Sequence, residues 1–402
     1  MKKLASLLQT DQITAKGNRS YWAPLNQSES ALAIANHAKN QPGLVVVLTE
    51  NSQIANQLQE TLGFFVEQST DILTFPEWET LPYDQFSPHQ DIVSERLKTL
   101  YRLPNIKRGI LIVPVATVMQ KVVPHDYIQQ FTFLLKTGDT LDVEAFSQQL
   151  ESASYQRVGQ VYEHGEFAIR GAIIDLFPMG SKTPFRIDLF DNEVETIRSF
   201  DPETQRSIEQ IDNIELLPAK EFNFTKQGID LFRNNFKDYF GDDSRESQIY
   251  KSVSQAQMVG GLEYYLPLFH NNLASLFDYL PKESLFFDFG QLNETLEHSL
   301  MDYSERYEIG QHNPDFPLLK PAEILLEPNA FLSQLKPYHR ITLETVCSKK
   351  TTTTFNTLNL PDLGVQAQSE YPLAKLIAFL DRYNKKVIYS AETTGRRETL
   401  LT

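Results

Sequence analysis

The stretch "GLVVVLTE", from Gly43 to Glu50, is a continuous apolar run rich in β-branched residues. Such a run is typical of a parallel strand that is buried on both faces of a sheet. A second run of this kind, "GILIVPVATVMQ", occupies residues 109–120. Helical spacing of apolar residues appears between and before these runs, for example in "SESALAIANHAKN" (28–40). The alternation of strands and helices predicts an α/β domain with a parallel sheet.

A further helix is expected in "SPHQDIVSERLKTLYRL" (87–103). Ser87 is a suitable N-cap residue, and Pro88 suits the first helical position. His89 could be a metal ligand or a base, but we interpret it as a solvent-facing residue of the first turn. The sequence therefore continues the α/β pattern to the end of this segment.

From about Thr137 the pattern changes to short strands separated by Gly, Pro and Asp-Asn turns, after one helix, "DVEAFSQQLESA". This predicts an antiparallel β-region. Beyond "NIELLPAKEF" the helical patterns return, so we infer that a β-domain is inserted within one α/β domain. The Thr-rich residues 340–360 read as a linker. A helix–strand–helix pattern follows it and stops midway at Thr402, so we expect a longer protein.

Composition describes a globular chain of 402 residues, long enough for two to four domains. No apolar run is long enough to span a membrane, and the polar residues after the basic start argue against a signal peptide. One cysteine, Cys347, excludes an internal disulfide framework and favours a reducing cytoplasm. The net charge of −15 argues against a surface that binds nucleic acid as a whole.

The motifs of catalytic and metal sites are missing from the sequence. None of the 17 glycines is followed by lysine, and "SYWAPLNQSESAL", where an α/β domain carries its phosphate loop, contains no glycine. The histidines do not form a His-Glu-x-x-His motif, and a single cysteine makes a zinc site unexpected. We therefore expect no catalytic residue, no cofactor and no metal in this chain.

Two strand patterns in the β-region contain arginines among apolar residues. In "TPFRIDLF" (183–190), alternation puts Arg186 and Phe190 on the face opposite the core. In "GEFAIRGAIIDLF" (165–177), the same reasoning puts Phe167, Ile169 and Ile173 on the core face and Arg170 on the other, with Ala168, Ala172 and Ile174. If the strands pair, Arg170, Arg186 and Phe190 share one outer face.

Two interpretations of this face stay open. An exposed Phe flanked by arginines has the composition of a protein-binding hot spot. Alternatively, Arg186 forms a cross-strand salt bridge with Asp175, Asp188 or Glu195, and Phe190 fills a domain junction.

Three blocks carry a resemblance to a known family: "FPEWETLPYDQFSPHQDIVSERLKTLYRL", "GEFAIRGAIIDLFPMGSKTPFRIDLFDNEVETIRSFDPETQRS" and "GGLEYYLPLF". In order and spacing they resemble the N-terminal part of the bacterial transcription-repair coupling factors (the Mfd family). More distantly, they are similar to the excision-repair protein UvrB. The sequence lacks the phosphate loop of UvrB and leaves no room for its DNA-clamping hairpin.

The resemblance implies an architecture of five parts. A UvrB-like α/β domain is split around an inserted UvrA-binding domain, and a linker leads to a truncated small α/β domain. The expected ranges are 1–131 and 218–339 for the two pieces of the α/β domain, 132–217 for the insert, 340–353 for the linker and 354–402 for the small domain.

The resemblance also implies a function, recruitment of the damage-recognition ATPase UvrA during nucleotide excision repair. The positions that match the family's UvrA contacts are Arg170, Arg186 and Phe190. RNA polymerase binding and an ATP- and magnesium-dependent double-stranded DNA motor are implied for other parts of the family's chain, one of which masks this face. The alternatives are a module with its own nucleotide site and a DNA-contacting domain.

Overall fold

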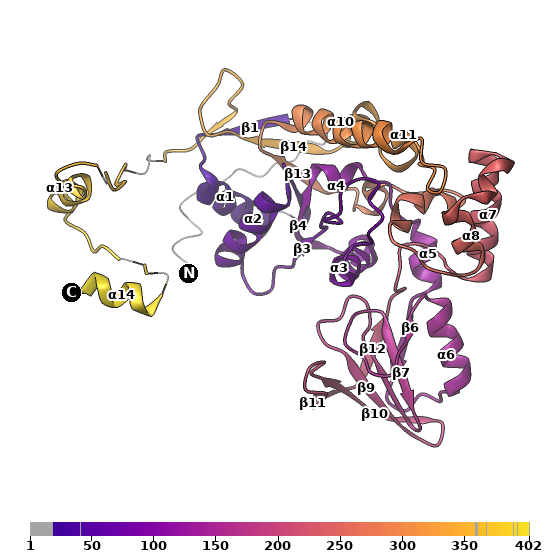
Figure 1. Cartoon of the computed structure of the whole chain (residues 1–402). Helices are drawn as coiled ribbons and strands as arrows, with labels where there is room; N and C mark the ends of the chain where they lie inside the picture. Colours follow the sequence, from indigo (N-terminus) through magenta and orange to yellow (C-terminus); the bar gives the residue numbers. More distant parts are fainter. Residues whose placement is uncertain are drawn as a thin grey trace. The chain divides into compact units, whose positions relative to one another are not determined.

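The computed structural model describes residues 19–401, except positions 41, 358–360, 367, 389 and 392 (Figure 1). The chain divides into two compact units, one ending at Phe355 and the other beginning at Asn356. The first unit contains a parallel sheet with helices on both faces and, lower in the view, a separate β-rich part (Figure 1). The predicted combination of an α/β fold with a β-rich insertion is confirmed.

The parallel sheet has seven strands in the order β15-β1-β14-β13-β2-β4-β3, and every pair in it is parallel. "GLVVVLTE" supplies β2, which lies between β4 and β13. Strands from before and after the β-rich part thus share one sheet. Its members are β1 (Arg19–Ala23), β2 (Gly43–Thr49), β3 (Ile72–Thr74), β4 (Arg108–Pro114), β13 (Leu285–Asp288), β14 (His339–Leu343) and β15 (Thr353–Thr354).

Burial on both faces explains why the strand β2 reads as a continuous apolar run. Its residues Val45 and Val47 lie in the hydrophobic core beneath α1 and α2. The alternate residues Leu44 and Val46 lie in the core on the opposite face. The helices of the first part of the chain are α1 (Gln27–Asn40), α2 (Ser52–Phe65), α3 (Gln90–Arg102), η2 (Leu103–Asn105), α4 (Val115–Met119) and α5 (His125–Gln130).

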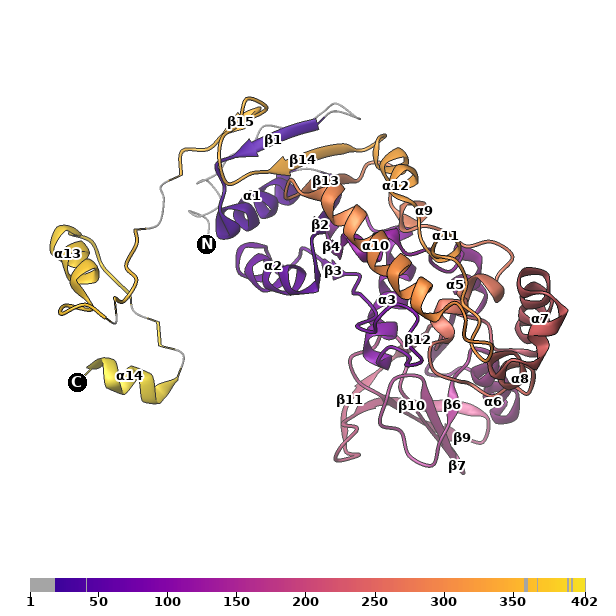
Figure 2. The ribbon, with the colours of Figure 1, turned by 45° about the horizontal axis from the view of Figure 1, so that its top comes forward.

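The β-rich part contains a six-stranded sheet in the order β11-β10-β9-β8-β7-β6, with α6 (Val143–Ser152) beside it (Figure 2). All its pairs are antiparallel except β6 with β7. The strands are β6 (Gln156–Arg157), β7 (Glu166–Arg170), β8 (Ile173–Leu176), β9 (Phe185–Phe190), β10 (Glu193–Phe200) and β11 (Ser207–Ile211). A two-stranded sheet of β5 (Phe133–Lys136) and β12 (Asn213–Leu216) lies where the chain enters and leaves this part.

The second piece of the α/β part is largely helical between β12 and β13. Two aromatic residues of α7 are fully buried: Phe232 packs against Phe269, and Phe236 packs against Tyr250. The helices from here to β15 are α7 (Lys226–Phe240), η3 (Asp242–Glu246), α8 (Gln248–Ser254), η4 (Leu262–Leu268), α9 (Leu276–Tyr279), α10 (Leu292–Gly310), α11 (Pro321–Ile324) and α12 (Pro328–Leu335).

A buried ion pair joins the helix α3 to the segment that returns from the β-rich part. Arg96 is fully buried, and its Nε donates to Glu221 Oε1 at 2.6 Å. Its Nη1 donates to the carbonyl oxygen of Pro76 at 2.9 Å. The guanidinium lies over the rings of Phe75 and Trp78, at 4.3 and 5.0 Å from their centroids. Arg96 therefore connects three segments that are distant in the sequence.

Two sequence predictions in the α/β part were wrong. The helix α3 begins at Gln90 and is capped by the side chain of His89, because Ser87 donates its hydroxyl to Glu263 instead. The linker predicted for 340–353 contains most of β14 at its start and the first residue of β15 at its end. β14 reads poorly as a strand because its short segment, "HRITL", is only partly apolar, yet it is buried between β1 and β13.

The second unit contains two helices among its described residues, α13 (Ala374–Arg382) and α14 (Thr394–Leu401). The strand expected between them is not formed by the described residues of 383–391. A strand needs a partner for its backbone groups, and none is described in this unit. Throughout the described chain, no helix combines the length and the apolar composition needed to cross a membrane.

His37 is a titratable residue of α1 whose side chain is buried in the core. It is 1% exposed and packs edge-on against Trp22 and Phe287, with ring centroids 5.7 and 5.6 Å away. Neither ring nitrogen has a hydrogen-bond partner within the described residues. Burial, with a smaller contribution from His339, lowers the pKa of His37 to about 4.

We predict that removing the buried ion pair destabilises the first unit strongly. Arg96→Met leaves the Glu221 carboxylate buried and unpaired, which should lower the free energy of unfolding by about 3–5 kcal/mol. Urea denaturation followed by circular dichroism measures the change. Arg102→Gln on the same helix, which breaks a half-exposed pair with Asp71, serves as the control and should change stability by less than about 1 kcal/mol. Equal effects of the two variants would contradict the assignment.

A second prediction concerns acid stability. Since the pKa of His37 is lower in the folded chain than in the unfolded chain, its contribution to stability is present above about pH 6.5 and decreases as the pH falls towards 4. Between pH 7 and pH 5 the loss should be about 2 kcal/mol. In His37→Leu this part of the pH dependence should disappear. Urea titrations of both proteins at the two pH values test it, and identical pH dependence contradicts it.

Candidate partner-binding face of the β-rich part

The outer face of the six-stranded sheet is defined here by Arg170, Asp175, Arg186, Asp188 and Phe190. Strand register assigns them to one side. Arg170 pairs with Ile173, and Asp175 pairs with Arg186 across β8 and β9. Paired residues share a face, as do residues two apart on one strand. The structure therefore places Arg170, Arg186 and Phe190 on the same side of the sheet, as alternation predicts.

One assignment within this region was wrong. Ile173 was expected in the core with Phe167, but it is the cross-strand partner of Arg170 and lies on the outer face with it. Ile174 is fully buried instead. The cause is a two-residue turn at Gly171 and Ala172, where Gly171 has a φ of +63°. Alternation cannot be continued through a turn, because the chain there is not extended.

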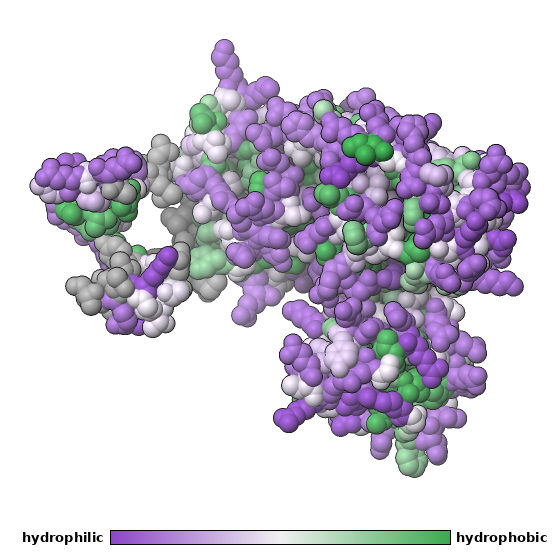
Figure 3. All heavy atoms as spheres, viewed as in Figure 1, coloured by the Kyte–Doolittle hydropathy of each residue, from purple (hydrophilic) through white to green (hydrophobic). Residues whose placement is uncertain are grey.

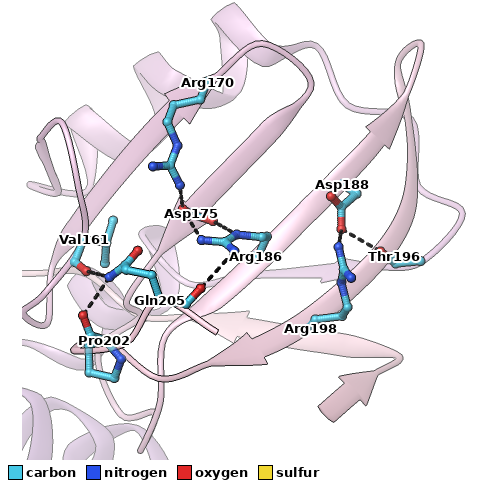
Figure 4. Close-up of polar contacts among 9 residues, drawn as sticks. All are labelled: Val161, Arg170, Asp175, Arg186, Asp188, Thr196, Arg198, Pro202 and Gln205. Atoms are coloured by element: carbon cyan, nitrogen blue, oxygen red, sulfur yellow. Dashed lines mark hydrogen bonds and ion pairs between the residues drawn. The ribbon is translucent and has the colours of Figure 1, made fainter. Parts of the chain in front are cut away.

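The Arg186 guanidinium is held tightly on this face (Figure 4). Its Nε donates to Asp175 Oδ1 at 2.7 Å and its Nη2 to Oδ2 at 3.0 Å. Its Nη1 donates to the carbonyl oxygen of Gln205 at 3.2 Å, and the group lies over the ring of Phe200. Hydrogen bonding to Asp175 raises the pKa of Arg186. Only 17% of the Arg186 side chain is exposed, so most of its surface is unavailable to a partner.

Arg170 and Phe190 are more accessible. Arg170 donates from Nη2 to Asp175 Oδ2, yet 47% of its side chain is exposed. Phe190, at the end of β9, is 69% exposed. In the space-filling view, apolar surface lies among hydrophilic residues over this sheet (Figure 3). The salt bridge of the alternative interpretation exists, between Arg186 and Asp175, whereas Phe190 is too exposed to fill a domain junction.

Sequence reasoning missed a second ion pair on the same face. Arg198 of β10 donates to Asp188 Oδ2, which also accepts from the Thr196 hydroxyl at 2.8 Å (Figure 4). The Arg198 side chain is 40% exposed. The alternation of polar and apolar residues in "EVETIRSF" is the signal that could have revealed it. The outer face thus presents two Arg–Asp clusters and, on the same side of the sheet, an exposed aromatic ring.

A cavity of about 800 Å³ lies at the carboxyl edge of the parallel sheet, where α/β folds commonly bind nucleotides. In the first turn of α1, Asn26 and Glu29 cap each other: Glu29 N–H donates to Asn26 Oδ1, and Asn26 N–H donates to Glu29 Oε2. The described lining residues include the carboxylates Glu50, Asp288 and Glu344 and no lysine or arginine. Burial raises the pKa of Asp288. This arrangement is unfavourable for a phosphate.

Comparison with known proteins identifies similar sequences. The UvrB interaction domain matches residues 133–222. The transcription-repair-coupling factor of Haemophilus influenzae is 43% identical over 374 residues, covering 92% of this chain and 32% of the relative. That of Escherichia coli is 41% identical over 387 residues, covering 96% and 34%. That of Rickettsia bellii is 31% identical over 303 residues. The chain spans about a third of the length of the curated relatives it matches.

We predict that the chain does not bind MgATP in this cavity. The Glu29 carboxylate already accepts from the Asn26 N–H at the start of α1, and the described lining residues supply no lysine or arginine to offset phosphate charge. Titration with a fluorescent ATP analogue should show no saturable signal at millimolar concentration. Saturable binding that Glu50→Lys strengthens would contradict the prediction and support a nucleotide site.

Proposed function

This chain is a homologue of part of the transcription-repair-coupling factors over more than nine tenths of its own length, and from that premise we propose that it recruits UvrA in nucleotide excision repair. The proposed contact is the outer face of the six-stranded sheet. Arg170, Arg186 and Phe190 are its proposed contact residues.

One observation carries the proposal: an exposed phenylalanine lies on the same sheet face as a half-exposed arginine, inside the matched UvrB interaction domain. A large exposed aromatic side chain on a regular strand is costly to leave in water and well suited to fill a pocket on a partner. The strand holds Phe190 at a fixed position, so little conformational freedom is lost on binding.

The two arginines contribute differently to the proposed contact. Arg170 keeps N–H donors exposed to solvent and can pair with a carboxylate of the partner. Arg186 is mostly covered and supports Arg170 through the Asp175 carboxylate that both bind. In this proposal, Phe190 supplies most of the affinity and Arg170 the charge complementarity.

The wider role is also a proposal. We place RNA polymerase binding and an ATP- and magnesium-dependent double-stranded DNA motor in those parts of the relatives that this chain does not match. The motor displaces a stalled polymerase, and the outer face then brings UvrA to the same site in the cytoplasm. In this scheme the 402 residues act as an adaptor between proteins and carry out no chemistry themselves.

We expect Phe190→Ala and Arg170→Ala each to weaken UvrA binding by on the order of 2 kcal/mol, because each removes a side chain at the proposed centre of the contact. Isothermal titration of purified UvrA into the 402-residue chain measures this. Phe64→Ala on α2 is a matched control, since Phe64 is 68% exposed but lies outside the β-rich part. Arg233→Ala on α7 is the control for the arginine.

Two outcomes would count against this assignment. If Phe190→Ala and Arg170→Ala both bind UvrA as tightly as the unmodified chain, the outer face is not the contact. If the unmodified chain does not bind UvrA at all, the recruitment function itself is wrong.

A further inference from the structure

We propose that Asp175 is a positioning residue, whose buried carboxylate fixes the Arg170 guanidinium in the orientation in which it meets the partner. The inference rests on the proposed function for the identity of that partner. The claim about Arg170 itself rests on the geometry of the outer face.

The Asp175 carboxylate is fully buried beneath two guanidinium groups. Its Oδ1 accepts from Arg186 Nε, and its Oδ2 accepts from Nη2 of both Arg186 and Arg170. Figure 4 shows both arginines pointing towards it from neighbouring strands. A buried carboxylate is strongly destabilising unless it is paired. The burial of Asp175 therefore favours the conformation in which both arginines stay hydrogen-bonded to it.

The shared carboxylate gives the two arginines separate roles. Arg186 is bound at both Asp175 oxygens and at Gln205, and its ring contact with Phe200 fixes it further. Among the described residues, Arg170 donates only to Asp175, so most of its five N–H groups remain available. Arg186 is thus the fixed support and Arg170 the group presented to a partner.

Asp175 also makes it possible for two cations to lie close together. Without its negative charge, the guanidinium groups repel each other, and the exposed one, Arg170, is free to move away. A mobile arginine loses more side-chain entropy when a partner orders it. Loss of Asp175 should therefore weaken binding through Arg170, although Asp175 is too deeply buried to touch the partner.

Asp175→Asn is the test variant, because it keeps the size of the side chain and removes its charge. We expect UvrA affinity to fall about tenfold, the cost of ordering one long side chain. A double-mutant cycle with Arg170→Ala then separates positioning from general damage. If Asp175 acts through Arg170, the double variant binds within about threefold of Arg170→Ala alone. If the two losses multiply, the inference is overturned.

A second measurement does not need UvrA. Phenylglyoxal modifies free guanidinium groups, and mass spectrometry of the 402-residue chain follows Arg170 separately. We expect Arg170 to react several times faster in Asp175→Asn than in the unmodified chain, because its hydrogen bond to the carboxylate is lost. Asp188→Asn is the matched control: it removes the neighbouring carboxylate, which pairs with Arg198, and should leave the rate at Arg170 unchanged.

The outcomes separate this inference from the proposed function. Equal Arg170 reactivity in Asp175→Asn and the unmodified chain overturns the positioning role, whatever UvrA does. Faster reaction at Arg170 in a chain that fails to bind UvrA supports the positioning role and contradicts UvrA recruitment. Urea unfolding at the labelling temperature shows whether a variant has lost its fold. Arg186→Lys keeps a cation beside Asp175, so Arg170 should react as slowly in this variant as in the unmodified chain.

Discussion

The buried ion pair between Arg96 and Glu221 is the interaction on which the first unit depends most. Glu221 lies where the chain re-enters the α/β part after the β-rich part, and Arg96 lies on α3, before that part begins. Because neither charge is stable alone in this environment, the exit segment has to pack against α3 for either charge to be buried. An insertion of this kind needs such a connection, since the covalent chain joins it at only two points.

Further contacts around α3 hold the β-rich part in place. The Ser94 hydroxyl accepts from the Gly180 N–H at 2.7 Å, and His164 contacts both Asp91, at 2.8 Å, and the carbonyl oxygen of Ser181, at 2.8 Å. These groups lie on the side of the β-rich part that faces α3. The outer face with Phe190 is left free of them, so the attachment of this part and its proposed contact with a partner use different surfaces.

Much of the fold and of the outer face could be predicted from sequence, because the burial of a strand determines the pattern of its apolar residues. Burial on both faces makes β2 a continuous apolar run, and burial on one face makes β9 alternate, which was enough to put Arg186 and Phe190 together. Ile173 was misplaced by a local turn, whereas two other failures have their cause in tertiary structure. β14 is buried by its neighbours despite a weak pattern, and Ser87 bonds to Glu263, which is 176 residues away. Asp175 was visible as a salt-bridge candidate, but its double pairing depends on three strands meeting in register.

The sheet order also has a consequence for the sequence of events during synthesis. β1, near the start of the chain, has β14 and β15 as its neighbours, and these are made more than 300 residues later. β1 therefore waits without a partner while the ribosome completes nearly the whole unit. The strands of the six-stranded sheet, by contrast, are contiguous in sequence and can all pair long before β14 emerges. The outer face proposed to bind a partner can thus form on the nascent chain before the seven-stranded sheet is complete.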